Sequence, residues 1–401
     1  MPAHVLEGNA VIGQGGGPTA VINQSLVGVV EGLLAAPEIG AIYGARHGVR
    51  GMIENRFTEL QNLPQHTLDR LAQTPSAGLG STRDKPDADY CQKIYEALRE
   101  KNVRYFFYIG GNDSSDTCRL VNEAAKAGDY ELRCFHIPKT VDNDLMENDH
   151  TPGYASAARY VALQHMGDSL DNASIPGIKI NVVMGRHAGF LTGAAALART
   201  HEDDGPHLIY VPERAFDLDA FCADVDKVYS KLGRCQITVS EGIQDADHTP
   251  ITTKFFQGET DAHGNVQLSG AGALGDQLSA YLKEKLTPQG GKAPRVRADT
   301  LGYAQRCWPD ASRVDQREAR EAGRFGARCA LMGQTDGSIA IKREASGPYR
   351  ARLERVELTS VAAKTRHLPD EHINASGNHM TESFVEWLRP LVDELPRFER
   401  I

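Results

Sequence analysis

The chain has 401 residues and a mass of 43.7 kDa, which is enough for two or three domains with cores of their own. Hydrophobic residues make up 41% and charged residues 24%, ordinary values for a globular protein that exclude long disorder, collagen and coiled coil. The net charge of -9 gives no general attraction to nucleic acid or to an anionic membrane. Any anion-binding site must therefore be local.

The seven cysteines form no CxxC pair, which argues against a zinc site or a disulfide framework and fits a reducing cytoplasm. The first residues lack a basic stretch followed by a long apolar run, and no segment approaches about 18 uninterrupted apolar residues. We therefore expect a cytoplasmic protein that has neither a membrane nor a nucleic acid as a partner.

Short apolar runs rich in Val, Ile, Tyr and Phe alternate with helical patterns, as is typical of βαβ units. In chain order, the predicted strands are Asn9–Gly13, Tyr105–Gly110, Cys134–Pro138, Lys179–Met184, His207–Val211, Gln236–Val239, Thr300–Gly302 and Ser338–Ile341. The predicted helices are Ala20–Leu34, Ser115–Ala127, Asp217–Leu232, Leu274–Lys285, Arg313–Leu331 and Glu382–Arg389. This order predicts an α/β protein with mainly parallel sheets.

A glycine-rich loop, Gly13-Gln14-Gly15-Gly16-Gly17-Pro18-Thr19, lies between the first predicted strand and helix. Glycines let the backbone approach an anion closely, and the N–H groups at a helix start attract phosphate. The loop is not a Walker A motif, because no Gly-Lys-Ser/Thr follows. Gly15, Gly17 and Ala20 fit a loose dinucleotide-binding pattern, which by itself is weak. A plain tight turn is the alternative.

Two further loops follow predicted strands. Gly110 to Ser115 read GGNDSS, and Pro138 to Asp144 read PKTVDND. Ligands bind at the carboxyl ends of the strands in open α/β sheets, so these loops predict a shared crevice. The second loop offers two acidic residues beside a lysine, the groups that phosphoryl transfer needs. Turn and helix-capping roles are the alternatives.

Several later motifs contain arginine or glutamate near predicted strands, where arginine suits phosphate and a carboxylate suits sugar hydroxyls. They are Met184-Gly185-Arg186, Ser240-Glu241-Gly242, Arg297, and Tyr303-Ala304-Gln305-Arg306.

The order and content of these motifs resemble the phosphofructokinase family from about Gly13 to Arg306. The segments GGGPTAVIN, GGNDS, PKTVDND, MGR, VSEG and YAQR occur in the family's order, and the C-terminal tail is similar to that of the long pyrophosphate-dependent members. The resemblance implies two Rossmann-like lobes with the active site in the cleft between them. Residues 1–153, completed by about 305–355, would form the phosphoryl-donor lobe. Residues 154–304, completed by the segment to residue 401, would form the fructose 6-phosphate lobe.

The implied reaction is reversible, Mg²⁺-dependent phosphoryl transfer from pyrophosphate to the 1-hydroxyl of fructose 6-phosphate, in glycolysis and gluconeogenesis. Asp142 would be the general base. The resemblance places Gly15 and Gly16 at the phosphoryl donor. The remaining sugar-phosphate contacts would come from Thr140, Val141, Met184, Gly185, Arg186, Glu241, Arg297, Tyr303 and Arg306. It also implies a homodimer or homotetramer.

Donor choice would depend on Asp113 and Lys139, which occupy positions where ATP-dependent relatives carry glycine. A carboxylate at 113 would repel the α-phosphate of ATP, whereas an ammonium at 139 would attract pyrophosphate and offset charge in the transition state. Asp144 would help to organise magnesium. Asn112 stands where many relatives have an aspartate ligand, so it is a neutral candidate for the same ion, directly or through water.

Three other functions are open at this point. One is an ATP-dependent kinase of the same fold, and another is a non-catalytic regulatory subunit, which the presence of Asp142 and the arginines disfavours. The third is a nicotinamide-dependent oxidoreductase, which needs an acidic residue at the end of the second strand. Residues 42–46 contain no acidic residue, which counts against it.

Overall fold

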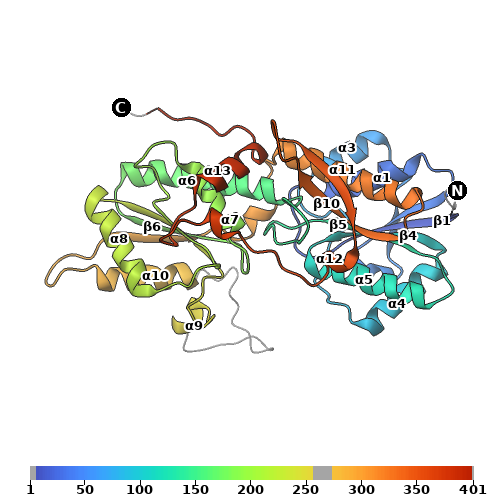
Figure 1. The fold of residues 1–401 in the computed structure, drawn as a ribbon, viewed down its shortest axis with the longest axis horizontal. Helices are drawn as coiled ribbons and strands as arrows, with labels where there is room; N and C mark the ends of the chain where they lie inside the picture. The colour runs from blue at the N-terminus through green and yellow to red at the C-terminus, as the bar shows by residue number, and fades with distance from the viewer. Residues whose placement is uncertain (1–5, 256–272, 400–401) are drawn as a thin grey trace. The chain divides into compact units, whose positions relative to one another are not determined.

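The protein is described by a computed structural model that covers residues 6–255 and 273–399. The chain divides into two compact units, Met1–Ala157 with Arg306–Arg366, and Ala158–Gln305 with His367–Ile401. Each unit contains one sheet and the helices that cover it (Figure 1). In the described part of the chain, no helix is both long and apolar enough to cross a membrane.

The first unit contains a seven-stranded sheet in the order β11-β10-β5-β4-β1-β2-β3. The five inner strands run parallel, and the edge strands β11 and β3 are antiparallel to their neighbours. The strands are β1 (Gly8–Gln14), β2 (Ile39–Ala45), β3 (Phe57–Glu59), β4 (Val103–Gly110), β5 (Arg133–Pro138), β10 (Asp336–Arg343) and β11 (Ala351–Val356).

Helices cover both faces of this sheet. They are α1 (Ile22–Leu34), α2 (Val49–Ile53), α3 (Gln65–Gln73), α4 (Ala88–Glu100), α5 (Asn112–Ala127), α11 (Arg313–Leu331) and α12 (Leu358–Val361). Side chains alternate along β4, so that Tyr105, Phe107 and Ile109 pack against α1, α3 and α11, whereas Phe106 and Tyr108 pack against α2, α4 and α5. A buried hydrophobic layer therefore covers each face of the sheet, and the carboxyl ends of the parallel strands lie at the same edge of it.

The second unit contains a four-stranded parallel sheet in the order β7-β8-β6-β9. Its strands are β6 (Ile178–Val183), β7 (Leu208–Tyr210), β8 (Cys235–Ser240) and β9 (Val296–Thr300). Its α-helices are α7 (Phe190–Gly193), α8 (Leu218–Leu232), α9 (Ile251–Phe255), α10 (Ala273–Lys285) and α13 (Glu382–Leu388); α6 (Tyr154–Ser174) begins in the first unit and continues in this one. Short 3-10 helices complete the chain: η1 (Ala194–Ala198), η2 (Gly302–Arg306), η3 (Asp370–His372) and η4 (Arg389–Leu391).

The α/β class predicted from the sequence is confirmed, and most predicted strands and helices overlap the observed ones. The predicted strand Thr300–Gly302 is wrong, because β9 ends at Thr300 and Gly302 adopts a left-handed φ of 59° that starts η2. Strands β2, β3 and β11, helices α3, α4 and α6, and the short helices α2, α7, α9 and α12 were not predicted. The glycines of β2 weaken its strand pattern.

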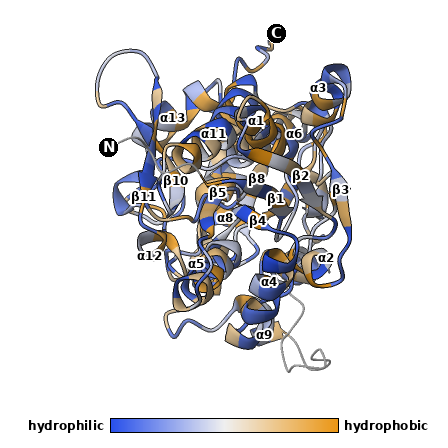
Figure 2. Ribbon diagram, turned by 90° about the vertical axis from the view of Figure 1, so that its right-hand side faces the viewer, coloured by the Kyte–Doolittle hydropathy of each residue, from blue (hydrophilic) through white to orange (hydrophobic). Residues whose placement is uncertain are grey.

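Helix α1 packs so closely on α11 that glycine is required at the contact. Figure 2 shows α1 mostly in hydrophobic colours, whereas the visible surface of α4 is mostly hydrophilic. A Cβ at Gly28 would lie 2.1 Å from the carbonyl oxygen of Arg320, and one at Gly323 would lie 2.2 Å from that of Ser25. The two helices must therefore move apart to accept any side chain at these positions.

We expect Gly28→Ala to lower the free energy of unfolding by about 1 to 3 kcal/mol, because overpacking forces backbone shifts. The measurement is the urea midpoint of purified protein. Gly167→Ala is the matched control, since Gly167 also lies in a helix but a Cβ there meets nothing within 4 Å. That control should gain up to about 1 kcal/mol from helix propensity. Equal midpoints for the two variants would contradict the close-packing explanation.

Candidate active site

The glycine-rich loop follows β1 and brings its backbone beside two cationic side chains. Gly16 has a φ of 74°, which favours glycine, and a Cβ there would lie 3.3 Å from Nζ of Lys139. A Cβ at Gly17 would lie 3.1 Å from the guanidinium carbon of Arg306. The backbone of the loop therefore lies beside the cationic groups of Lys139 and Arg306, an arrangement that can bind an anion.

Lys139 follows β5 and is almost completely buried, with 3% of its surface exposed. Its ammonium donates a hydrogen bond of 2.6 Å to the carbonyl oxygen of Gly17. Burial and the charge of Arg306 lower the pKa of Lys139 to about 8, although Asp142 and Asp144 act in the opposite direction. A partly desolvated ammonium of this kind is stabilised by a multiply charged anion.

The acidic loop after Lys139 is held by its own hydrogen bonds. The Asp142 N–H donates to Oγ1 of Thr140 at 3.1 Å, and the Thr151 hydroxyl donates to the Thr140 carbonyl at 2.9 Å. Asn143 lies between the two aspartates with a φ of 58°, a conformation that asparagine tolerates well. Val141 is buried, whereas Asp142 is half-buried and accessible from solvent.

Asn112 and Asp144 are in contact, with Nδ2 of Asn112 donating to the Asp144 carboxylate at 3.0 Å. Asn112 opens α5, one turn earlier than the predicted helix. Its Oδ1 is buried and accepts no hydrogen bond from the described residues. Burial raises the pKa of Asp144, while hydrogen bonds from Thr140 and Asn112 and the charge of Lys139 partly offset this rise. A buried amide oxygen and a carboxylate with a raised pKa therefore lie close together at this position.

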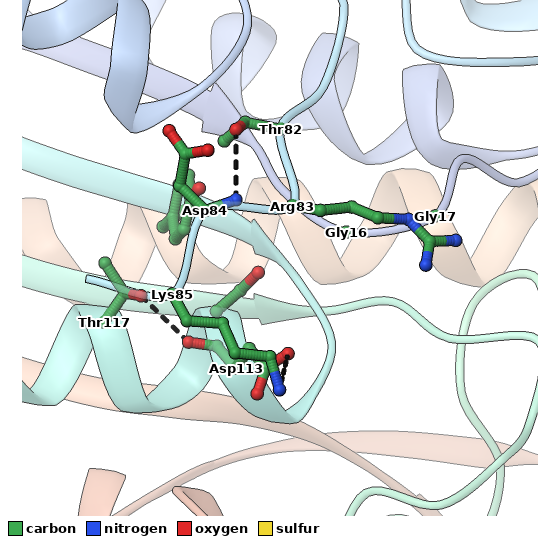
Figure 3. A pocket seen from close by; sticks show the side chains of 10 residues that line it. Gly16, Gly17, Thr82, Arg83, Asp84, Lys85, Asp113 and Thr117 are labelled. Carbon is green, nitrogen blue, oxygen red and sulfur yellow. Dashed lines mark hydrogen bonds and ion pairs between the residues drawn. The ribbon is translucent and has the colours of Figure 1, made fainter. Parts of the chain in front are cut away.

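A cavity of about 260 Å³ opens beside Gly16 and Gly17 (Figure 3). Its wall includes Asp113 and the segment 82–85, and Figure 3 shows the side chain of Arg83 extending toward the glycines. Nζ of Lys85 lies 3.3 Å from the Asp113 carboxylate. The cavity therefore carries both signs of charge, with Asp113 on its rim.

The sequence-based prediction missed the segment 82–85. The signal was present, because Gly80-Ser81-Thr82-Arg83-Asp84-Lys85 combines small residues with two cations just before α4. Arg50 donates to the Asp84 carboxylate and holds its pKa below the ordinary value. This pairing fixes Asp84 at the outer end of the segment.

Within the second unit, several predicted residues gather at the carboxyl edge of the four-stranded sheet. Met184, Gly185 and Arg186 follow β6, and Glu241 follows β8, where its N–H donates to the Val183 carbonyl at 2.8 Å. Tyr303 lies in η2 just after β9, with 53% of its surface exposed. Because β6, β8 and β9 run parallel, the residues that follow their carboxyl ends lie at the same edge of the sheet.

Arg297 does not join this group within the unit. Arg297 lies near the start of β9, directly opposite Lys179 on β6. Met184 comes five residues after Lys179, just beyond the end of β6. At about 3.3 Å per residue, that separation is roughly 16 Å. Arg306 lies at the end of η2 and belongs to the first unit, where it borders Gly17.

A buried histidine ties the far end of the acidic loop to α11. His150 is 1% exposed, with Nδ1 2.9 Å from Asp149 and Nε2 2.6 Å from Glu318. Burial alone lowers the pKa of His150, but hydrogen bonds to Asp149 and Glu318 outweigh it and raise the pKa to about 9. The Tyr349 hydroxyl also donates to Glu318 at 2.8 Å. The imidazolium therefore sits between two carboxylates.

We expect His150→Gln to be less stable than the parent at pH 6, with a smaller difference at pH 10. The folded-state pKa exceeds the unfolded value of about 6.5, so this stabilisation is complete below pH 6.5 and is lost as the pH rises through about 9. Urea unfolding of both proteins at the two pH values measures the effect. A difference that stays constant would contradict it.

A sequence profile of the phosphofructokinase family matches residues 9–330. The chain belongs to the phosphofructokinase family. A pyrophosphate–fructose 6-phosphate 1-phosphotransferase of Rhodospirillum rubrum is 54% identical over 390 residues, covering 97% of this chain and 95% of that protein. The enzyme of the same name from Halomonas elongata is 36% identical, over 98% and 94% of the two chains.

Solved structures agree with this family assignment. A crystal structure of a pyrophosphate-dependent phosphofructokinase from Marinobacter aquaeolei has a TM-score of 0.84 and 30% identity, with 98% of this chain and 94% of that chain covered. The family membership expected from the motifs is therefore confirmed, and the match extends over nearly the whole phosphofructokinase chain.

Proposed function

We propose that this phosphofructokinase catalyses reversible transfer of a phosphoryl group from pyrophosphate to the 1-hydroxyl of fructose 6-phosphate, giving fructose 1,6-bisphosphate and phosphate. The observation that carries this proposal is the placement of Lys139, whose buried ammonium contacts the glycine-rich loop at Gly17. The names of the similar enzymes from Rhodospirillum and Halomonas support the same reaction.

Pyrophosphate is the donor in this proposal because of the charges around the cavity. Gly15 and Gly16 supply backbone without side chains, and Lys139 supplies a buried cation whose charge the pyrophosphate anion can neutralise. Asp113 lies on the cavity rim, where its carboxylate would meet the α-phosphate of a longer donor. The site attracts a short, highly charged donor and repels a nucleotide.

Asp142 is the general base in the proposed mechanism. As the 1-oxygen of the sugar attacks the terminal phosphorus, the bond from that phosphorus to the bridging oxygen breaks and phosphate leaves with the electron pair. The carboxylate of Asp142 takes the hydroxyl proton, and the hydrogen bond from the Asp142 backbone N–H to Oγ1 of Thr140 holds the backbone at this position. Lys139 offsets the negative charge that develops in transfer.

Magnesium fits the pair formed by Asn112 and Asp144. The Oδ1 atom of Asn112 is buried without a donor among the described residues, and a cation would also stabilise the charged form of the buried Asp144 carboxylate. Mg²⁺ in proteins usually keeps several waters and is held by one or two carboxylates together with substrate phosphates. Bound Mg²⁺ would neutralise phosphate charge during transfer.

Within the second unit, we propose that the sugar phosphate is bound by Met184, Gly185, Arg186, Glu241 and Tyr303, which follow strands at one edge of the sheet. Arg306, which borders Gly17 in the first unit, is proposed as a separate phosphate contact. Arg297, the second residue of β9, lies roughly 16 Å along the sheet from Met184, and we propose that it contacts the sugar phosphate bound by a neighbouring copy. We therefore propose a homodimer or homotetramer, to be tested by light scattering of the eluted protein. The seven cysteines are all free, which supports a cytoplasmic location.

The decisive experiment is a coupled assay with fructose 6-phosphate and Mg²⁺, in which pyrophosphate or ATP is offered alone. We expect turnover with pyrophosphate and at least a hundredfold lower kcat/KM with ATP. Comparable or faster turnover with ATP would overturn the proposed donor. Product identity is checked by the release of phosphate and the formation of fructose 1,6-bisphosphate.

A further inference from the structure

The wall of the cavity is part of a long segment without regular structure. Helix α3 ends at Gln73 and α4 begins at Ala88, and no helix or strand is present between them. This segment nevertheless places residues 82–85 against Gly16 and Gly17. A loop of this length is ordered only where specific contacts overcome its conformational entropy.

Two buried amides supply such contacts. Asn23, in the first turn of α1, is 0% exposed and donates through Nδ2 to the carbonyls of Thr74 at 2.9 Å and Ser76 at 2.8 Å. Its Oδ1 accepts from the Gly78 N–H at 2.9 Å and from the Gln14 side chain at 3.0 Å. All four hydrogen-bonding positions of the Asn23 amide are thus used.

Gln14 extends this network to the next residue of the segment. It ends β1, is also 0% exposed, and its Oε1 accepts from the Leu79 N–H at 3.1 Å. Beyond Leu79, the Ser81 hydroxyl donates to the Gly16 carbonyl at 2.6 Å, and the Gly16 N–H donates to the Thr82 carbonyl at 2.9 Å. Two sets of hydrogen bonds, joined through the backbone of residues 79–81, therefore hold the segment against β1 and the glycine-rich loop.

We propose that Asn23 and Gln14 are positioning residues for the pyrophosphate site, since they set the place of the segment 74–85 and so of its cavity wall. This inference rests on the proposed function. Neither side chain is exposed, so both act through the backbone that they hold and not by touching substrate. Their neutrality means that replacing them leaves the charge of the site unchanged.

The test compares Asn23→Ala with the parent. We expect the KM for pyrophosphate to rise about tenfold, because several hydrogen bonds that order the wall are lost. The kcat and the KM for fructose 6-phosphate should stay within about twofold, and amide hydrogen exchange should speed up in residues 76–82. Ser81→Ala, which removes a single bond to Gly16, should raise the KM for pyrophosphate about threefold.

Asn172→Ala is the matched control. Asn172 is also buried, at 5% exposure, and donates to the Gly177 carbonyl at 2.9 Å in the second unit. It should lose stability without any change in the KM for pyrophosphate. An unchanged pyrophosphate KM in Asn23→Ala, or equal changes in both KM values, would overturn the positioning role.

Two further outcomes are distinguishable. If Asn23→Ala does not fold, the KM for pyrophosphate is measured in Ser81→Ala and Gln14→Ala instead. A raised KM supports the positioning role, and an unaltered KM in both variants overturns it. If the parent enzyme does not use pyrophosphate, the proposed function fails separately. Hydrogen exchange in the segment 74–85 then decides: faster exchange confined to it supports the positioning role, and unchanged exchange refutes it.

Discussion

The Asp142→Asn protein is expected to lose kcat by about a thousandfold in both directions of the reaction, the range in which a general base contributes. The amide keeps the size of the side chain but cannot accept the proton of the sugar hydroxyl. Initial rates with pyrophosphate and fructose 6-phosphate, and with phosphate and fructose 1,6-bisphosphate, measure the loss. The KM values should change far less than kcat, because the base acts mainly in the transition state.

Asp116→Asn is the matched control for this prediction. Asp116 is an aspartate on α5 in the same unit, paired with Arg119 at 2.8 Å, and such surface pairs contribute little to stability. Its replacement should leave kcat unchanged within about twofold. An Asp142→Asn enzyme with a tenth or more of the parent kcat would remove Asp142 from the role of base.

Replacement of both Asp113 and Lys139 by glycine is expected to lower kcat/KM for pyrophosphate by about ten- to a hundredfold. Loss of a charge-assisted contact costs about 1.5 to 3 kcal/mol, and Lys139 is buried where no water can replace it fully. Removal of the Asp113 carboxylate should at the same time make turnover with ATP measurable. Steady-state kinetics with each donor measure both effects.

The single variants separate the two contributions. Asp113→Gly alone should retain most of the pyrophosphate activity, because its carboxylate contacts Lys85 on the rim of the cavity and not the glycine-rich loop. Lys139→Gly alone should account for most of the loss. Parent-like pyrophosphate kinetics in the double variant would refute the explanation of donor choice.

Local sequence patterns were sufficient to predict the elements that carry the glycine-rich and acidic loops. The strands β1, β4 and β5 are mostly apolar and buried on both faces, so each contains a short hydrophobic run that is followed by glycine or proline. Helix α6 was missed because its buried residues do not follow a single face. Tyr154, Ala155, Ala157 and Ala158 are all buried, so no amphipathic period appears.

Other features of the site could not be read from residue spacing. Asn23 and Gln14 contact residues about 50 to 65 positions later, and nothing local to GGGPTAVIN indicates those partners. The same holds for His150, whose imidazole meets Glu318 on α11. Such contacts depend on which segments the sheet topology brings together.

The sequence alone determined the α/β class, the family resemblance and the residue types of the chemistry, because motifs that bind phosphate are short, local and ordered along the chain. The tertiary structure decided how these residues are held: the burial that lowers the pKa of Lys139, the hydrogen bond between Asn112 and Asp144, and the amide contacts that place residues 82–85. These properties arise from desolvation and from hydrogen bonds between distant segments, and both exist only after the chain has folded.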